Sequence, residues 1–173
     1  RLAAIAAVPT GGVHLAVRTQ SYQYCSTCPG SGNQVCKQDR GHQLALIRLG
    51  SDGTEQANVA VDPMPVVTSV VQLDPMELRW SSDGHLVLSL VRSNHCTANE
   101  MSLLKLSTSG AIVQWKETVG AYAQLVRNGT GHGLLFADKY QQLDVDLTVT
   151  NTVAMVAAQV AGTPEGDFYT GAR

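Results

Sequence analysis

A pair of β-hairpin patterns recurs three times along the chain, and this repetition constrains the fold more than any other feature of the sequence. The first hairpins fall at 3–18, 76–91 and 121–137, and the second hairpins at 43–61, 101–118 and 141–157. Apolar and polar residues alternate in each hairpin, and Gly, Asn or Asp-Gly turns separate the strands, which is typical of half-buried antiparallel strands. The repeated unit is therefore four antiparallel strands. In the third unit, the second turn is predicted to end at Asn151.

A fourth unit begins at about Gln159, with a turn at 163–166 and a second strand near 168–172, and lacks its last two strands. Four-stranded units at spacings of about 40–50 residues are typical of β-propeller blades, which gain a core only by stacking. We therefore expect an all-β fold, a partial β-propeller of about three and a half four-stranded antiparallel blades in a single domain. The blades are predicted at about 1–65, 66–120, 121–158 and 159–173. A β-sandwich is the competing fold, although it has no reason to repeat at a fixed phase.

One repeat resembles a known family of propellers. The segment Leu106-Ser107-Thr108-Ser109-Gly110-Ala111-Ile112-Val113-Gln114-Trp115 is similar to the strand–turn–strand of quinoprotein-like (PQQ-like) blades, which carry a Gly in the turn and a Trp ending the next strand. The segment 49–54 is a weaker copy without the Trp, and the third copy, near Asn151, lacks both residues. The resemblance implies a propeller fold and does not imply the quinone cofactor.

The charge of the chain argues against two classes of partner. Charged residues make up 15% of the sequence and the net charge is −2, so the basic footprint of a nucleic-acid-binding protein is missing. No apolar stretch approaches the roughly 20 residues that cross a bilayer as a helix. We therefore expect no nucleic-acid partner and no transmembrane segment.

Four cysteines suggest an oxidising compartment. Cys25, Cys28 and Cys36 fall in the loop between the second and third strands of the first unit, and Cys96 falls in the equivalent loop of the second unit. Equivalent loops of adjacent blades lie side by side, so two disulfides are expected, which favours an extracellular, cell-surface or periplasmic location. Sequence leaves the connectivity open; a bridge from Cys96 to the loop, with the other two joined inside it, is slightly preferred.

Zinc is the alternative use of these thiols. Four thiolates, or three thiolates with the imidazole of His95, would suit a tetrahedral zinc site. The close pair Cys25 and Cys28 supplies half of the usual zinc motif, and the second close pair is missing. No other cofactor is expected.

Two further features are candidates for surface chemistry. Lys37, Asp39 and Arg40 form a charged rim beside the cysteines and could contact a partner. The triplet that begins at Asn128 is a glycosylation sequon, which is compatible with a secreted protein.

Histidines and carboxylates are the remaining polar candidates. His14, His85 and His132 each follow the first turn of a unit, so they could line a metal or anion site, or simply cap turns. Asp144 and Asp146 alternate and are predicted to share the solvent face of a strand rather than to form a glycosidase pair. No residue is assigned a catalytic role.

These observations favour a non-catalytic binding or scaffold module of an exported or cell-surface protein, acting through the loops on the propeller faces. The expected partner is another protein or further blades of the parent chain. The alternative is part of a quinoprotein-like or glycosidase-like propeller enzyme.

The incomplete ring and the tryptophans lead to two further expectations about burial. An incomplete ring should leave apolar surface bare at its first and last units, including Leu2, Ile5, Val8, Phe168 and Tyr169. Trp80 and Trp115 are predicted to be largely buried within the second unit.

Overall fold

The computed structural model describes residues 3–18, 23–27, 34–38, 44–61, 72–93, 100–118, 123–129, 131–155, 159–162 and 168–171. All regular structure in these ranges is β-strand, which confirms the predicted all-β class. These residues accordingly include no helix long and apolar enough to cross a membrane.

In the ranges that the structure describes, sixteen strands form three four-stranded antiparallel sheets and two separate hairpins. Sheet 1 consists of β1 (Ala3–Ala7), β2 (Val13–Arg18), β5 (Leu44–Leu49) and β6 (Glu55–Val61). Sheet 2 consists of β7 (Gln72–Trp80), β8 (Leu86–Ser93), β9 (Glu100–Leu106) and β10 (Ile112–Thr118). Sheet 3 consists of β11 (Gln124–Asn128), β12 (Gly131–Leu135), β13 (Lys139–Leu143) and β14 (Val149–Ala154).

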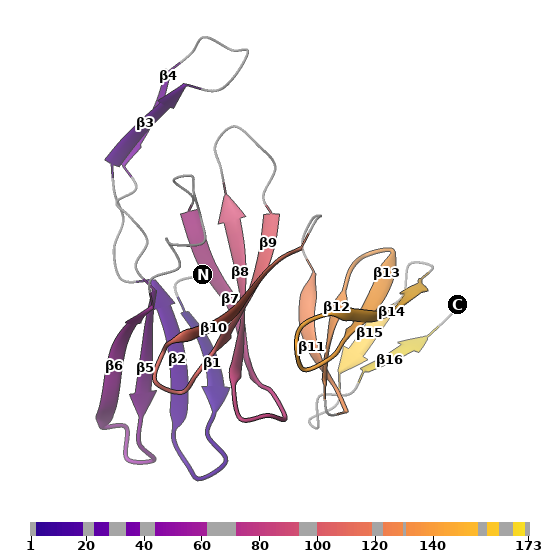
Figure 1. Ribbon diagram of the computed structural model, residues 1–173, viewed down its shortest axis with the longest axis horizontal. Helices are drawn as coiled ribbons and strands as arrows, with labels where there is room; N and C mark the ends of the chain where they lie inside the picture. The colour runs from indigo at the N-terminus through magenta and orange to yellow at the C-terminus, as the bar shows by residue number, and fades with distance from the viewer. Residues whose placement is uncertain are drawn as a thin grey trace.

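The two hairpins are β3 (Gln23–Thr27) with β4 (Gln34–Gln38), and β15 (Gln159–Gly162) with β16 (Phe168–Gly171). The first hairpin is inserted between the second and third strands of sheet 1, and Figure 1 shows it beyond the end of that sheet. The second hairpin supplies the two strands that were predicted for the fourth unit.

The three sheets follow one another along the molecule (Figure 1). Their first strands lie closest together, because β7 contacts both β1 and β11. Each sheet is a meander in which neighbouring strands in space are neighbours in the repeat. The predicted four-stranded antiparallel unit is therefore confirmed in all three copies.

The second turn of every sheet has the same hydrogen bonds. Its first residue is Gly50, Ser107 or Asp144, and the carbonyl of that residue accepts from the fourth residue of the turn. The fourth residue has a positive φ in each case: Gly53 (80°), Gly110 (84°) and Leu147 (56°). This geometry is a type I turn followed by a left-handed residue, which glycine adopts without steric cost.

A β-bulge follows this turn at the same place in each sheet. The register shifts between Ile112 and Gln114 in β10, and equivalent shifts occur opposite Arg48 and Leu49 and opposite Gln142 and Leu143. A shared turn and a shared bulge allow residues to be matched between the sheets position by position.

The third sheet corrects one prediction. Its second turn begins at Asp144 and closes at Leu147, four residues before the predicted end at Asn151. The Asp144 carboxylate stabilises this turn by accepting from the backbone N–H groups of Asp146 and Thr148. The turn was misplaced because Leu147, which is 3% exposed, occupies the left-handed position where the other sheets have Gly.

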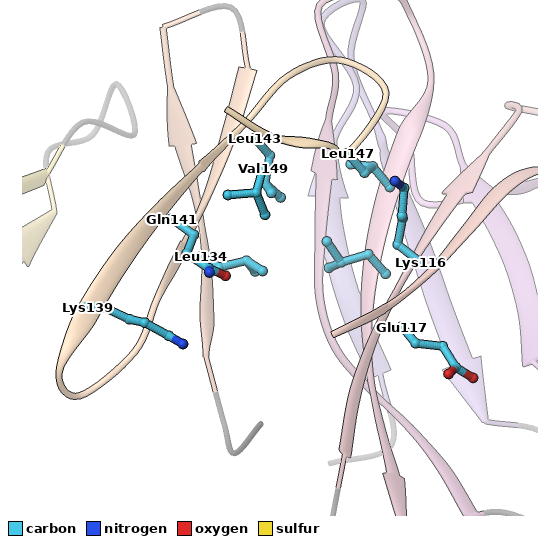
Figure 2. A pocket seen from close by; sticks show the side chains of 9 residues that line it. Lys116, Glu117, Leu134, Lys139, Gln141, Leu143, Leu147 and Val149 are labelled. Carbon is cyan, nitrogen blue, oxygen red and sulfur yellow. The ribbon is translucent and has the colours of Figure 1, made fainter. Parts of the chain in front are cut away.

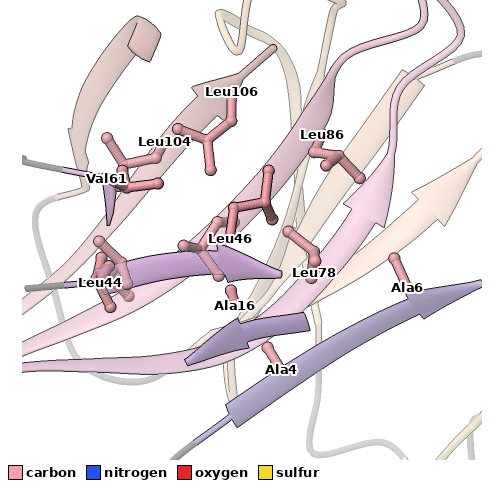
Figure 3. Close-up of a cluster of buried hydrophobic side chains, with 12 residues drawn as sticks. Ala4, Ala6, Ala16, Leu44, Leu46, Val61, Leu78, Leu86, Leu104 and Leu106 are labelled. Carbon is pink, nitrogen blue, oxygen red and sulfur yellow. The ribbon is translucent and has the colours of Figure 1, made fainter. Parts of the chain in front are cut away.

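Sheet 2 is buried on both faces. One face of β8 and β9 meets sheet 1 through Leu86, Leu88, Leu90, Leu104 and Leu106 (Figure 3). The other face meets sheet 3 through Val87, Met101 and Leu103. Burial on both faces accounts for the almost uninterrupted apolar sequence of β8.

The order of packing gives each sheet a front and a back face. We define the front face of sheet 2 by Leu86 and Leu88, which pack on sheet 1, and its back face by Val87 and Leu103, which pack on sheet 3. Leu49, Leu106 and Leu143 occupy the same position before the second turn, and they pair with Val13, Leu86 and His132 respectively. Val13 and His132 are therefore the equivalents of Leu86 in sheets 1 and 3. The fronts of sheets 2 and 3 thus pack on the backs of sheets 1 and 2.

Candidate functional site

A cavity of about 480 Å³ lies between the back of sheet 2 and the front of sheet 3 (Figure 2). Its apolar walls are Leu103, Leu134, Leu143, Leu147 and Val149, and its polar rim is Lys116, Glu117, Lys139 and Gln141. In Figure 2 the Lys139 ammonium points toward the space between the sheets, whereas the Glu117 carboxylate points away from it. The volume is within the range of about 300–1,000 Å³ that is typical of ligand pockets.

The face of sheet 3 that lines the cavity lacks an aromatic side chain that sheet 2 has at the matching position. Trp115 pairs with Leu104 and packs into the cluster between sheets 1 and 2. At the matching position of sheet 3, Thr152 pairs with Gln141. Side chains of directly opposed residues share a face, so Thr152 is on the cavity side. A hydroxyl-bearing side chain thus replaces an indole where the outer strands of adjacent sheets diverge.

Three polar side chains of sheet 2 reach across this interface to the turn at 144–148. Lys105 Nζ donates to the carbonyl of Val145 at 2.6 Å, and Gln114 Nε2 donates to the carbonyl of Asp146 at 2.6 Å. Lys116 Nζ is 3.5 Å from Thr148 Oγ1. These bonds position the turn that carries Leu147, and hence one wall of the cavity.

Lys105 also joins an ion pair at the end of sheet 2. Its ammonium is almost completely buried and is 2.5 Å from Asp83 Oδ2. Burial opposes ionisation of Asp83, but hydrogen bonds from Lys105, Ser81 and His85 outweigh it and hold the pKa of Asp83 well below its ordinary value. The Asp83 carboxylate therefore stays ionised, and its contact with Lys105 links the first turn of sheet 2 to β9.

His132 is the buried titratable group of the same interface. Its side chain is 0% exposed, and neither ring nitrogen has a hydrogen-bond partner among the described residues. Burial, together with the nearby charge of Arg127, lowers the pKa of His132 to about 4. The imidazole is thus neutral at pH 7.

The three histidines do not occupy equivalent positions, so a shared site built from a row of equivalent imidazoles is not formed. The registers match His132 to Leu86, and His14 to Val87, while His85 precedes β8. The first turns of sheets 1 and 2 are equally long, but His14 lies inside β2 whereas His85 precedes β8. The first turn of sheet 3 pairs Asn128 directly with Gly131 and is shorter than the other two, which shifts His132. Sequence offset alone could not reveal that difference in turn length.

His14 belongs instead to the interface between sheets 1 and 2. Its ring meets the edge of Trp80 with centroids 5.4 Å apart, and the Trp80 indole N–H donates to the carbonyl of Ala7 at 2.6 Å. Burial and the charge of Arg48 lower the pKa of His14. Arg18 and Asp74 add an ion pair of 2.6 Å between the same sheets.

Both tryptophans lie where the sequence predicted, in the first and fourth strands of the second unit. They are partly rather than largely buried, and both pack against the cluster between sheets 1 and 2. They act at the margin of that interface and not at its centre.

The cysteine predictions fall mostly outside the described residues. Cys28, Cys96 and His95 are not described, and of Cys25 and Cys36 the structure describes only the backbone. The register of β3 and β4 places Cys25 directly opposite Cys36. Among the described residues, no group of three His, Cys, Asp or Glu side chains could hold a metal ion; the zinc alternative concerns residues beyond them.

The remaining predicted residues have separate locations. Lys37 is in β4, of which only the backbone is described, and Asp39 and Arg40 lie outside the described residues. Asn128 ends β11, and its side-chain amide donates to Tyr140 Oη at 2.8 Å. The nitrogen that would carry a glycan is therefore engaged in a hydrogen bond within sheet 3.

Asp144 and Asp146 are not on the solvent face of a strand as predicted. Both are in the turn between β13 and β14, where Asp144 stabilises the backbone and Asp146 faces Lys105 at 3.7 Å. Their role in the structure is to shape the turn.

Comparisons with protein-family models, with curated proteins and with solved structures found no match to this chain.

Proposed function

We propose that this chain is a non-catalytic binding or scaffold module, built as part of a β-propeller and covered by further sheets of the same kind. The repeated meander, its shared turn and bulge, and the convergence of β1, β7 and β11 support a radial arrangement of blades. The observation that carries the proposal is the front face of sheet 1.

That front face is apolar, and none of the described sheets packs on it. Ile5 pairs with Leu15, and Leu15 pairs with Ile47, so these side chains form one row across three strands. Ile5 is 61% exposed, and Val13, Leu15, Val17 and Ile47 are half-buried. Exposed apolar surfaces of this kind mark interaction sites.

The repeat indicates what covers it. The equivalent front faces of sheets 2 and 3 are each packed on the back of a preceding sheet. The complement of the row around Ile5 is therefore the back face of another four-stranded sheet, from further blades or from another molecule.

Light scattering after size exclusion tests this proposal on the 173-residue chain. Association that rises with concentration is expected, and a double variant, Ile5→Lys with Leu15→Lys, should abolish it. Val113→Lys is the matched control, because Val113 is 53% exposed but lies at the bulge of β10. A cooperatively melting monomer, unchanged by the double variant, would contradict the proposal.

We propose further that the protein is exported and that Cys25 and Cys36 form a disulfide. Opposed residues of antiparallel strands have Cα atoms about 4.5–5.5 Å apart, within the span of about 4.4–6.8 Å that a disulfide bridges. The two thiols would give two hydrogens to an oxidising disulfide by thiol–disulfide exchange. Cys28 would then remain for Cys96.

Alkylation and peptide mass measurement test this pairing. In a Cys28→Ser, Cys96→Ser variant, the peptide 19–37 should be two hydrogens lighter before reduction and should resist alkylation. A Cys25→Ser, Cys96→Ser variant should instead expose two alkylatable thiols. Equal protection in both variants would contradict the pairing, and free thiols with bound zinc would favour the metal site.

A further inference from the structure

The cavity between sheets 2 and 3 combines size, apolar walls and a cationic rim. Its volume is about 480 Å³ and its walls are leucine and valine side chains. Apolar walls of this kind favour a ligand with an apolar body. The charged groups on its rim then determine which apolar molecule fits.

The interface between sheets 1 and 2 has a planar aromatic side chain at the matching position. In that interface, the indole of Trp115 packs against the cluster that contains Leu104 and Leu106. In sheet 3 the corresponding residue is Thr152. The space beside the outer strand is thus occupied by a planar aromatic ring in one interface, whereas the next interface has a threonine at the matching position.

The rim favours an anion. Lys116 and Lys139 place two ammonium groups on it, against one carboxylate, that of Glu117. Lys139 Nζ is held 4.8 Å from the centroid of the Phe136 ring, and Lys116 Nζ is near Thr148 Oγ1. Both ammonium groups therefore keep hydrogen-bond donors available for an acidic group at the mouth of the cavity.

We propose that this cavity is a binding site for a small aromatic anion, whose ring occupies the space that Trp115 fills in the preceding interface and whose acidic group lies at Lys139. The ligand would bridge β9 and β10 of sheet 2 to β13 and β14 of sheet 3. This site is separate from the front face of sheet 1 and does not depend on the function proposed for that face.

The experiment compares two fluorescent probes with the same rings. 1-Anilinonaphthalene-8-sulfonate carries a sulfonate, and N-phenyl-1-naphthylamine lacks it. Titration of the 173-residue chain should give one saturable site that binds the sulfonate several-fold more tightly. Equal affinities for the two probes, or unsaturable binding, would overturn the proposal.

Three variants locate the site. Thr152→Trp should abolish the saturable binding by filling the space beside the outer strand, and Asn58→Trp should leave it unchanged. Asn58 is the matched control, because it has the equivalent position in sheet 1 and is exposed. Loss of binding in Asn58→Trp but not in Thr152→Trp would place the probe on the front face of sheet 1 and overturn the assignment.

Lys139→Gln provides a test that does not require repacking of the interface. Removal of this half-buried charge is expected to weaken binding of the sulfonate probe by at least roughly two- to fivefold, the range of an exposed ion pair, and to leave binding of the neutral probe unchanged. Thermal melting of each variant checks that it is folded. An unchanged affinity for the sulfonate in folded Lys139→Gln would overturn the role of the rim.

Discussion

The interface between sheets 1 and 2 and the interface between sheets 2 and 3 use the same strands of the repeat, but they are built from different chemistry. The first has the larger apolar cluster, with Trp115 packed at its outer margin and the Arg18–Asp74 ion pair beside it. The second has a smaller apolar cluster, hydrogen bonds from Lys105 and Gln114 to the turn of sheet 3, and a cavity. Backbone geometry is conserved between these interfaces while the side chains that fill them are not.

Two matched positions explain the difference. A Cβ on Gly110 would be 2.9 Å from Val59 Cγ1, so the turn of sheet 2 lies directly against sheet 1. At the equivalent place in the next interface, Lys116 replaces Val59 and Leu147 replaces Gly110. The flexible side chain of Lys116 leaves room for Leu147. Burial of the Leu147 side chain offsets the cost of its left-handed backbone.

Among the variants that compare the two interfaces, truncation of Trp115 should cause the largest loss of unfolding free energy. Trp115→Ala is expected to cost about 3 kcal/mol of unfolding free energy, the lower end of the range for aromatic truncations, because the indole is only partly buried. Denaturant unfolding measures it. Thr152→Ala at the matching position should change the stability by less than about 0.5 kcal/mol, as for an exposed substitution. Similar losses in the two variants would mean that the interfaces are filled alike.

Acid should weaken the second interface through the buried imidazole of His132. The pKa of His132 is lowered from 6.5 to about 4. Between these pH values the imidazole is protonated in the unfolded chain but stays neutral in the folded chain. The stabilisation is present above about pH 6.5, is lost as the pH falls toward 4, and amounts to about 3 kcal/mol. His14, with a lowered pKa, adds to the loss in the same direction. Unfolding free energies measured from pH 7 to pH 4 check this expectation.

The control for this pH dependence is His132→Leu, which introduces the residue found at the matching position of sheet 2, Leu86. It removes two buried nitrogens that have no partner among the described residues. The variant should be more stable at pH 5 and should show a shallower pH dependence. Identical pH profiles for variant and parent would contradict the assignment to His132.

The smallest expected effect comes from two glycines with similar φ. Gly110→Ala should cost about 2 kcal/mol, and Gly53→Ala about 1 kcal/mol, because both strain a left-handed residue but only Gly110 is packed. A Cβ on Gly53 would meet nothing within 4 Å, whereas a Cβ on Gly110 would meet Val59. Thermal unfolding of the two variants gives the difference. Equal costs would show that the turn of sheet 2 is not in close contact with sheet 1.

The sequence was sufficient to predict the repeat and its strands, because alternation and turn residues are local signals. It located β5, β6, β10 and the hairpin of β15 and β16 closely. It misplaced the second turn of sheet 3, since Leu147 carries no local signal for a left-handed backbone. That conformation is stabilised by burial against another sheet, which periodicity does not encode.

The cavity could not be predicted, although one clue to it was visible. The absence of a tryptophan from the third repeat was apparent in the sequence, but its consequence depends on which strands face each other. The bulge opposite Gln142 and Leu143 decides that Thr152 shares a face with Gln141. Without that register, the residue matching Trp115 could not be identified, and the missing aromatic remained only a weak point of the resemblance.

The packing of front faces on back faces also limits the symmetry of any assembly. A two-fold axis through the row around Ile5 would bring two front faces together, an arrangement that neither interface of the molecule uses. The back of sheet 1 covers the front of sheet 2, and the back of sheet 2 covers the front of sheet 3. A further sheet that covers the row around Ile5 in the same way makes a heterologous contact, which advances in one direction. Such contacts end only when the rotation closes a ring; otherwise they continue as an open, growing array. The angle between successive sheets, rather than the strength of any one contact, therefore sets the number of units in a closed assembly.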